Sequence, residues 1–165
     1  RQMVAELRQV TSAILDEVHD LALELRPAIL DDLGLVMALQ RYVEEFKRKF
    51  NIPVDYHTVG FENNRLPPQT EITLYRIIQE ALSNVALHAH PNNVSVLLEH
   101  LGSTVLAIVE DDGRGFNLDK LMNSCVKEKL GLYGMQERAN LIGGILKIES
   151  QPGMGTSVFV EAPVK

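Results

Sequence analysis

Four polar side chains recur at every fourth position of one predicted helix, beside its apolar stripe: Arg76, Glu80, Asn84 and His88. Residues four apart lie on the same side of a helix, so these side chains form one file. Within it, the carboxylate of Glu80 and the amide of Asn84 are hard oxygen ligands, suited to Mg²⁺ and to ordering a water molecule. A solvent-exposed helix face would produce the same pattern, so the chemical interpretation depends on the rest of the chain.

Three glycine-bearing turns lie downstream of this helix. Glu110-Asp-Asp-Gly-Arg-Gly-Phe116 follows an apolar strand, where glycines let the backbone approach a ligand and a carboxylate can accept hydrogen bonds. Gly131-Leu-Tyr-Gly134 is expected to open a helix, whose free N–H groups favour an anion such as phosphate. Gly153-Met-Gly155-Thr156 leads into the last strand. The chain has neither of the common glycine-rich phosphate motifs, so a nucleotide would have to be held in another way.

The elements that must position these residues follow from apolar periodicity and from breaks at Gly and Pro. The pattern predicts helices over 33–50, 68–89 and 131–141, and strands over 53–59, 94–100, 104–109, 145–149 and 156–161. Asp31 and Asp32 are expected to cap the first of these helices, and residues 117–130 to form a loop. The connection 101–103 is too short for a crossover helix, which excludes a doubly wound parallel sheet. The order predicts an α+β two-layer sandwich, with helices on one face of a mostly antiparallel or mixed sheet.

A long N-terminal helix is predicted to precede this sandwich. Residues 1–26 carry one apolar stripe without Gly or Pro, and Pro27 ends it, so we place the domain boundary there. The chain begins at Arg1 inside this helical pattern, which indicates a piece of a longer protein.

The file and the three turns, in this order, resemble the N, G1, G2 and G3 boxes of the ATP-binding domain of sensor histidine kinases. The matching segments are Glu80-Ala-Leu-Ser-Asn-Val-Ala-Leu-His-Ala89, 110–116, Gly131-Leu-Tyr-Gly-Met-Gln-Glu-Arg138 and 153–156. That domain shares its sandwich, the Bergerat-type ATP-binding fold, with DNA gyrase B, Hsp90 and MutL. Segment 21–35, which contains Leu25-Arg26-Pro27, and the string 134–139 narrow the resemblance to nitrate-sensor and DesK-like kinases.

The resemblance implies a role for each matching position. Asn84 would coordinate Mg²⁺ on the ATP phosphates, and Glu80, the catalytic residue, would orient or deprotonate the attacking group. His88 would reach toward the phosphates or hold the box together. Asp111 would accept a hydrogen bond from the exocyclic amine of adenine, supported by Thr156. The remaining ATP-binding residues implied are Gly113 and Gly115 beside the base, and Gly131, Leu132 and Gly134 near the phosphates, under a lid formed by 117–130. The chemistry would be in-line phosphoryl transfer, for which the protein mainly supplies position and charge.

Two positions depart from the family pattern. Many members carry Lys or Arg before the histidine of the first box, where this chain has Leu87, so that a cationic phosphate contact is either lost or supplied elsewhere. Many also carry a glycine where Lys129 stands. Whether Lys129 or Arg76 contacts phosphate stays open at this stage.

His19 lies in a sequence, Glu17-Val-His19-Asp20, that resembles the phospho-acceptor site of these kinases. In the family, however, the acceptor helix comes first, and a second helix ends in the Leu-Arg-Pro found here at 25–27. We therefore assign His19 to the second dimerisation helix and expect the acceptor histidine upstream of this chain. The predicted domains are 1–27, the end of the dimerisation hairpin, and 28–165, the ATP-binding catalytic domain.

Composition restricts the partners. A net charge of -6 disfavours nucleic acid, and the lone Cys125 excludes a disulfide framework and fits a reducing compartment. No apolar run is long enough to span a membrane, so the sequence predicts a cytoplasmic chain, with any anchor in segments outside it. The resemblance implies ATP and Mg²⁺ as ligands, a homodimer formed through the N-terminal helix, and a response regulator as the partner of the full-length kinase.

Two alternatives remain open on sequence. One is an ATPase or anti-sigma-type serine kinase with the same fold, against which the helix ending in Leu-Arg-Pro speaks. The other is an interaction module whose boxes have decayed, against which the joint presence of the box residues speaks.

Overall fold

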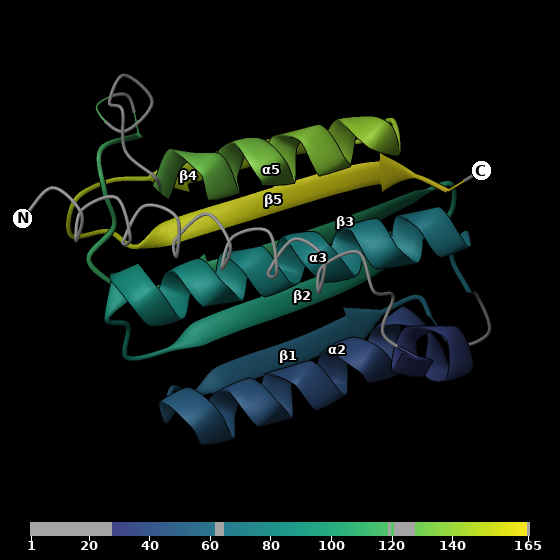
Figure 1. Cartoon of the computed structure of the whole chain (residues 1–165), viewed down its shortest axis with the longest axis horizontal. Coiled ribbons are helices and arrows are strands. Elements are labelled where there is room, and N and C mark those ends of the chain that lie inside the picture. The colour runs from purple at the N-terminus through teal and green to yellow at the C-terminus, as the bar shows by residue number, and fades with distance from the viewer. Residues whose placement is uncertain (1–27, 62–64, 119, 121–127, 165) are drawn as a thin grey trace, which may run out of the picture.

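The computed structural model describes residues 28–61, 65–118, 120 and 128–164. Within them, a five-stranded sheet forms one layer and the helices form the other (Figure 1). The elements in chain order are α2 (Ala28–Phe50), β1 (Val54–Val59), α3 (Pro68–Asn84), the π-helical turn η1 (Val85–Ala89), β2 (Val94–Leu101), β3 (Thr104–Asp111), α5 (Glu128–Leu141), β4 (Ile145–Ser150) and β5 (Thr156–Pro163). The predicted helix over 1–26 and His19 lie outside the described residues, as does Cys125.

The sheet is mixed, in the strand order β1-β2-β3-β5-β4. β1 pairs with β2 in parallel, because α3 runs back between them as the crossover connection. The other pairs are antiparallel, and Gly102 and Ser103 form the tight hairpin turn between β2 and β3. The prediction of an α+β two-layer sandwich with a mixed sheet is confirmed.

Alternate residues of the three central strands face the helices, as the two-residue period of a strand requires. Their buried side chains are Val94, Val96 and Leu98 on β2, Val105, Ala107 and Val109 on β3, and Val158, Val160 and Ala162 on β5. Each fully buried valine or leucine among them stabilises the fold by about 1.5–3 kcal/mol.

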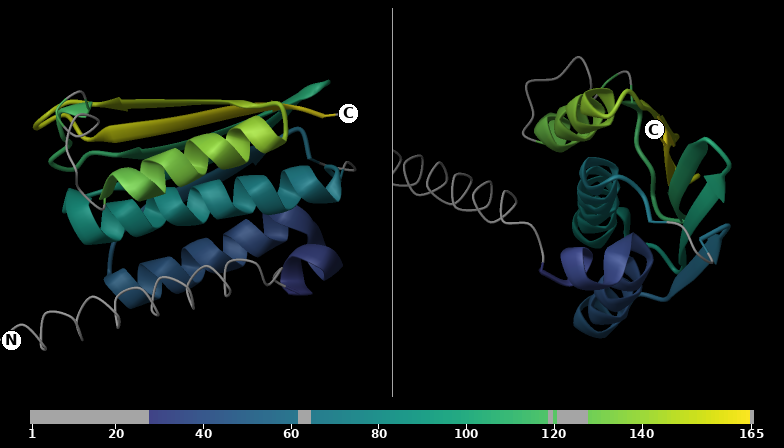
Figure 2. Two further views of the ribbon diagram at one scale, coloured as in Figure 1. Left: turned by 45° about the horizontal axis from the view of Figure 1, so that its top comes forward. Right: turned by 90° about the vertical axis from the view of Figure 1, so that its right-hand side faces the viewer.

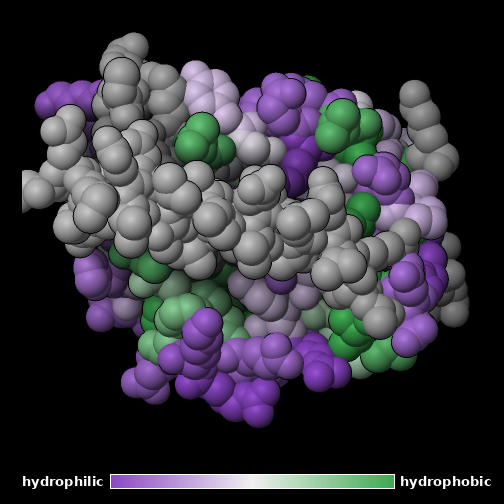
Figure 3. Space-filling view, viewed as in Figure 1, coloured by the Kyte–Doolittle hydropathy of each residue, from purple (hydrophilic) through white to green (hydrophobic). Residues whose placement is uncertain are grey.

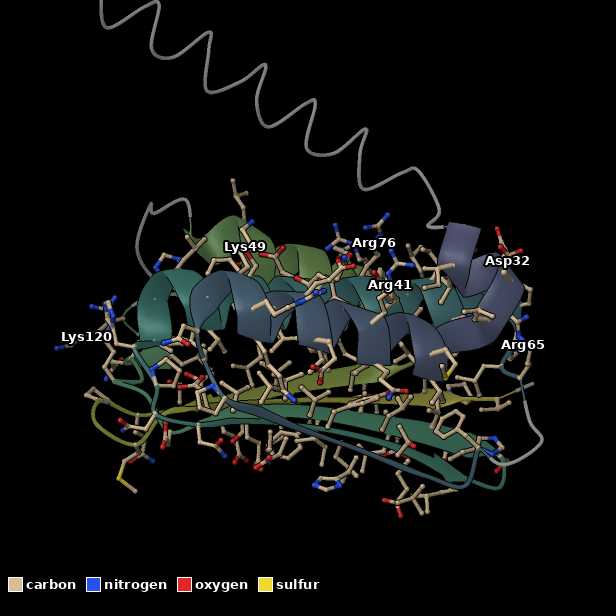
Figure 4. The ribbon with its side chains drawn as sticks, turned by 90° about the horizontal axis from the view of Figure 1, so that it is seen from below. Asp32, Arg41, Lys49, Arg65, Arg76 and Lys120 are labelled. Atoms are coloured by element: carbon tan, nitrogen blue, oxygen red, sulfur yellow. The ribbon has the colours of Figure 1, made fainter. Side chains whose placement is uncertain are left out.

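The three long helices cover one face of the sheet, with α3 between α2 and α5 (Figure 2). Side chains fill the space between the two layers (Figure 4). The apolar stripe of α3 forms the centre of this core: Leu74, Ile77, Ile78, Ala81 and Leu82 are all buried. Hydrophilic residues gather instead along the edge of the molecule that α2 forms (Figure 3). None of the described helices is long and apolar enough to cross a bilayer.

α2 begins earlier than predicted and is kinked. It starts at Ala28 rather than at Leu33, and Gly34 interrupts it with φ 77° and ψ 177°. Arg65 holds the first segment in place by donating from Nη2 to the carbonyl of Leu30 (2.8 Å) and from Nη1 to that of Asp31 (2.9 Å). Its Nη2 also pairs with the carboxylate of Glu71 (2.8 Å), which is only 2% exposed. The basic side chain therefore supplies the donors that carbonyls at a helix end need.

Two further helix boundaries differ from the sequence prediction. α5 begins at Glu128 instead of Gly131, so that Gly134 lies inside the helix rather than at its free N–H end. The predicted helix 68–89 changes to a π-helical turn at Val85 and ends in a left-handed residue, His90, with φ 51°. π-Helical turns widen a helix locally and occur frequently at functional sites.

Candidate functional site

A cavity of about 170 Å³ opens where the end of α3 and η1 meet the start of α5 and one end of the sheet. Most of its wall is apolar, built from Ala81, Val85, Ala89, Val109, Phe116, Leu132, Met135, Ile148 and Val158. Its polar groups are few and come from separate segments: Asn84, His88, Asp111, Arg114 and Thr156. An apolar cavity with a small number of convergent polar groups is the usual form of a small-molecule site.

Asp111 is the acidic group of this cavity. It ends β3 directly opposite Thr156, the first residue of β5, and its Oδ1 accepts a hydrogen bond from the backbone N–H of Gly113 (2.9 Å). Burial raises the pKa of the Asp111 carboxyl above its ordinary value, and the backbone N–H groups of Gly113 and Thr156 partly oppose this rise. The side chain is therefore a half-buried, positioned acceptor.

Ser150 connects the turns around Asp111 and was not predicted from sequence. Its hydroxyl accepts from the N–H of Phe116 (2.9 Å), donates to the carbonyl of Gly155 (3.0 Å) and lies 2.9 Å from the hydroxyl of Thr156. No sequence motif marks a serine at the end of a strand, because its three partners come from two other segments of the chain.

Two glycines of these turns allow backbone segments to meet. A Cβ on Gly115, which has φ 53°, would overlap the carbonyl oxygen of Gln151, and one on Gly155, which has φ 74°, would overlap that of Asp111. Glycine is required at both positions because the backbone is left-handed and has no room for a side chain.

Only two of the four polar residues of the predicted helix file line the cavity. Asn84, at the end of α3, and His88, on η1, line the cavity. Glu80 lies one turn earlier, and its carboxylate is where a Cβ on Gly131 of α5 would be. Arg76 does not line the cavity: it is 9% exposed, and its Nη1 donates to Oε1 of Gln79 (2.7 Å).

The cavity thus brings together six of the residues that the sequence selected: Asn84, His88, Asp111, Gly115, Leu132 and Thr156. Glu80, Gly113, Gly131 and Gly134 are nearby but outside its lining. Gly113 leaves room for the backbone of Ala89 rather than for a ligand, since a Cβ there would overlap that residue's carbonyl oxygen. Most of the predicted lid 117–130, including the side chain of Lys129, lies outside the described residues.

Residues 69–165 match the model of the histidine kinase-, DNA gyrase B-, and HSP90-like ATPases. The chain is 39% identical over 155 residues to the oxygen sensor histidine kinase NreB of Staphylococcus carnosus, covering 94% of this chain and 44% of that protein. It is 34% identical over 161 residues to the signal transduction histidine-protein kinase/phosphatase DegS of Brevibacillus brevis, covering 98% of this chain and 40% of that protein. The chain therefore spans less than half the length of these relatives.

Solved structures confirm the fold. The histidine kinase domain of a blue-light activated histidine kinase from Erythrobacter litoralis superposes with a TM-score of 0.62 at 24% identity, covering 79% of this chain and 61% of that one. The full-length kinase ShkA in complex with AMPPNP gives a TM-score of 0.60 at 19% identity, covering 79% of this chain and 29% of that one. The two sequence relatives belong to the nitrate-sensor and DesK-like subfamily that the upstream segment predicted. The chain therefore belongs to the histidine kinase-, DNA gyrase B- and HSP90-like ATPase family, and the two relatives that it resembles in sequence are histidine kinases.

Proposed function

We propose that this cavity binds ATP with Mg²⁺ and that the full-length protein transfers the γ-phosphate to a histidine on a helix upstream of this chain. The observation that carries the proposal is the convergence of Asn84, His88, Asp111 and Thr156, from separate segments, on one largely apolar cavity. The apolar wall suits a planar base, and the polar groups suit its amine and the phosphates.

Adenine is held by Asp111. One oxygen of its carboxylate is engaged by Gly113, and the carboxylate accepts a hydrogen bond from the exocyclic amine of the base. Because Asp111 is half-buried, this bond is little weakened by competing water. Ser150 keeps Thr156 and the turn at Gly155 in place beside the base. A guanine, which presents a carbonyl oxygen at that position, would be repelled by the carboxylate.

The residues present fit a magnesium ion bound together with the nucleotide. The described residues contain no group of three or more His, Cys, Asp or Glu that could hold a metal by itself. The amide oxygen of Asn84 in the cavity wall is a suitable single ligand for Mg²⁺, which usually takes its other ligands from substrate phosphates and water. When bound, the ion supplies positive charge to the phosphates during transfer.

Glu80 acts on the attacking imidazole. It lies one helical turn before Asn84 and against Gly131 of α5, so that the start of α5 fixes the position of its carboxylate. A carboxylate there orients the incoming histidine or accepts its proton, and His88 supports the phosphates from the next turn. The protein contributes mainly by positioning the two reactants.

The partners belong to the full-length protein. We propose that residues 1–27 are the end of the dimerisation hairpin, that the homodimer forms through it, and that the phosphate passes to a response regulator. Residues 28–165 form the catalytic domain. The protein works in the cytoplasm, and any membrane anchor lies in segments outside this chain.

The test is a titration of ATP, with Mg²⁺, into this chain and into the Asp111→Asn variant. We expect the variant to bind ATP about tenfold or more weakly, since it loses a charged hydrogen-bond acceptor. Equal affinity in the two proteins would refute the assignment of the base-binding site. Extension of the chain by its upstream helix should then give acid-labile, base-stable phosphate, whereas phosphate on this chain that disappears in His19→Gln would show that His19 is the acceptor.

A further inference from the structure

Binding of ATP in this cavity requires positive charge close to the phosphates. ATP is strongly anionic, the chain carries a net charge of -6, and the cavity wall contains the carboxylate of Asp111. The residue before His88, Leu87, is 65% exposed and uncharged. Among the described residues that line the cavity, Arg114 is the only lysine or arginine.

The backbone of Arg114 is fixed on both sides. Its N–H donates to the carbonyl of Ala89 at the end of η1 (2.8 Å), and its carbonyl accepts from the N–H of Gly153 (2.7 Å). Ala89 directly follows His88, so Arg114 is held against the part of η1 that lines the cavity. Its side chain is exposed and long, and starts from this fixed point at the cavity wall.

Among the described residues, the arginines on α3 and α5, Arg76 and Arg138, lie outside the cavity lining. Arg76 does not line it and donates to Gln79. Arg138 does not line it either, and its Nη1 lies 3.0 Å from where a Cβ on Gly134 would be. An arginine is well suited to binding the phosphates, because its guanidinium stays charged and can form two parallel hydrogen bonds with one phosphate.

We propose that Arg114 is a phosphate-binding residue, whose guanidinium binds the phosphates of the bound nucleotide and supplies the cation that position 87 lacks. This inference rests on the proposed binding of ATP in the cavity. It assigns two functions to the end of β3 and the turn that follows it: Asp111 binds the base and Arg114, three residues later, binds the phosphates.

The experiment compares ATP and adenosine as ligands for this chain, by calorimetry at low ionic strength. Arg114→Gln should weaken ATP about tenfold and leave adenosine within about twofold, because only ATP carries the phosphates. Arg114→Lys should retain most of the ATP affinity, and the loss in Arg114→Gln should shrink at high salt. Thermal unfolding of each variant checks that the turn is still folded.

Arg41→Gln is the matched control. It removes the same charge from α2, where Arg41 is 69% exposed and pairs with Glu45, in the helix layer and outside the cavity lining (Figure 4). Unchanged ATP affinity in Arg114→Gln, or an equal loss of affinity for ATP and adenosine, would overturn the inference about Arg114. Neither result would contradict the proposal that the cavity binds ATP. Failure of the unaltered chain to bind either ligand would instead refute the proposed function.

Discussion

Replacing Gly155 by alanine tests whether the turn before β5 holds Asp111 in position. Gly153 offers a matched control in the same turn, because both glycines have left-handed backbone, with φ 74° at Gly155 and 80° at Gly153. A Cβ on Gly153 would have no atom within 4 Å. A Cβ on Gly155 would overlap the carbonyl oxygen of Asp111 and lie 3.2 Å from the Cα of Asp112.

The size of each effect follows from this difference. Left-handed backbone costs alanine about 1–2 kcal/mol, and the smaller entropy of its unfolded chain offsets about 0.4–1 kcal/mol of that. Gly153→Ala should therefore lower the free energy of unfolding by about 1 kcal/mol. Gly155→Ala adds an overpacking cost of about 1–3 kcal/mol, because backbone rather than a flexible side chain must move. In a domain of this size, the two losses correspond to falls in Tm of roughly 3 °C and roughly 10 °C.

The assay combines urea unfolding followed by circular dichroism with titration of ATP into each variant. Gly153→Ala should bind ATP as the unaltered chain does, whereas Gly155→Ala should bind several-fold more weakly because Asp111 and Thr156 are displaced. Equal losses of stability in the two variants, with equal ATP affinity, would refute the conclusion that the close approach of Gly155 to Asp111 positions the carboxylate.

Three further outcomes are expected. Gly131→Ala should leave the fold intact, since alanine favours a helix by about 1 kcal/mol over glycine and only the end of Glu80 is in the way. Because the added Cβ displaces that carboxylate, phosphotransfer in a chain extended by its acceptor helix should fall while ATP binding persists, and full transfer would refute the conclusion that the start of α5 positions Glu80 for the reaction. Ser150→Ala should lower the free energy of unfolding in urea by about 1–3 kcal/mol, because it leaves the N–H of Phe116 and the carbonyl of Gly155 without their partner. Ser157→Ala is the control and should lower it by less than about 0.5 kcal/mol, because the Ser157 hydroxyl bonds to the exposed Glu110. Adenosine affinity should be constant above the raised pKa of Asp111 and fall as the pH is lowered through it, because a protonated carboxyl is a poor acceptor for the hydrogen bond from the amine. The fall should be absent in Asp111→Asn, and a fall of the same shape in that variant would show that another group titrates.

The strands and the sandwich could be predicted because their signals are local. Alternation along β2, β3 and β5 identifies which side chains face the helices, and a connection as short as Gly102-Ser103 allows only a hairpin. Glu80, Asn84 and His88 are spaced four residues apart, and helix geometry alone predicts that such residues lie on one side of a helix. The family resemblance came from such segments in their order along the chain.

The helix starts were predicted less well because they depend on partners distant in sequence. The first segment of α2 is held by Arg65, which lies more than thirty residues later and donates to Leu30 and Asp31. The aspartates that suggest an N-cap at 31–32 are inside α2 instead. Similarly, Gly131 suggested the start of α5, although the helix begins at Glu128 and the glycine makes room for Glu80.

By itself, the sequence determined the fold class, the family and the residue types available for binding a nucleotide, since periodicity and motifs are properties of neighbouring residues. Only the tertiary structure decided which of those residues share a cavity. The pairing of β3 with β5 sets Asp111 opposite Thr156, and that of β4 with β5 sets Ser150 opposite Thr156 on its other side. The return of the turn after β3 to η1 bonds Arg114 to Ala89, the residue that follows His88, so that Arg114 and His88 line the same cavity. These contacts depend on strand register and helix packing, because each contact joins atoms that are close in space and far apart along the chain.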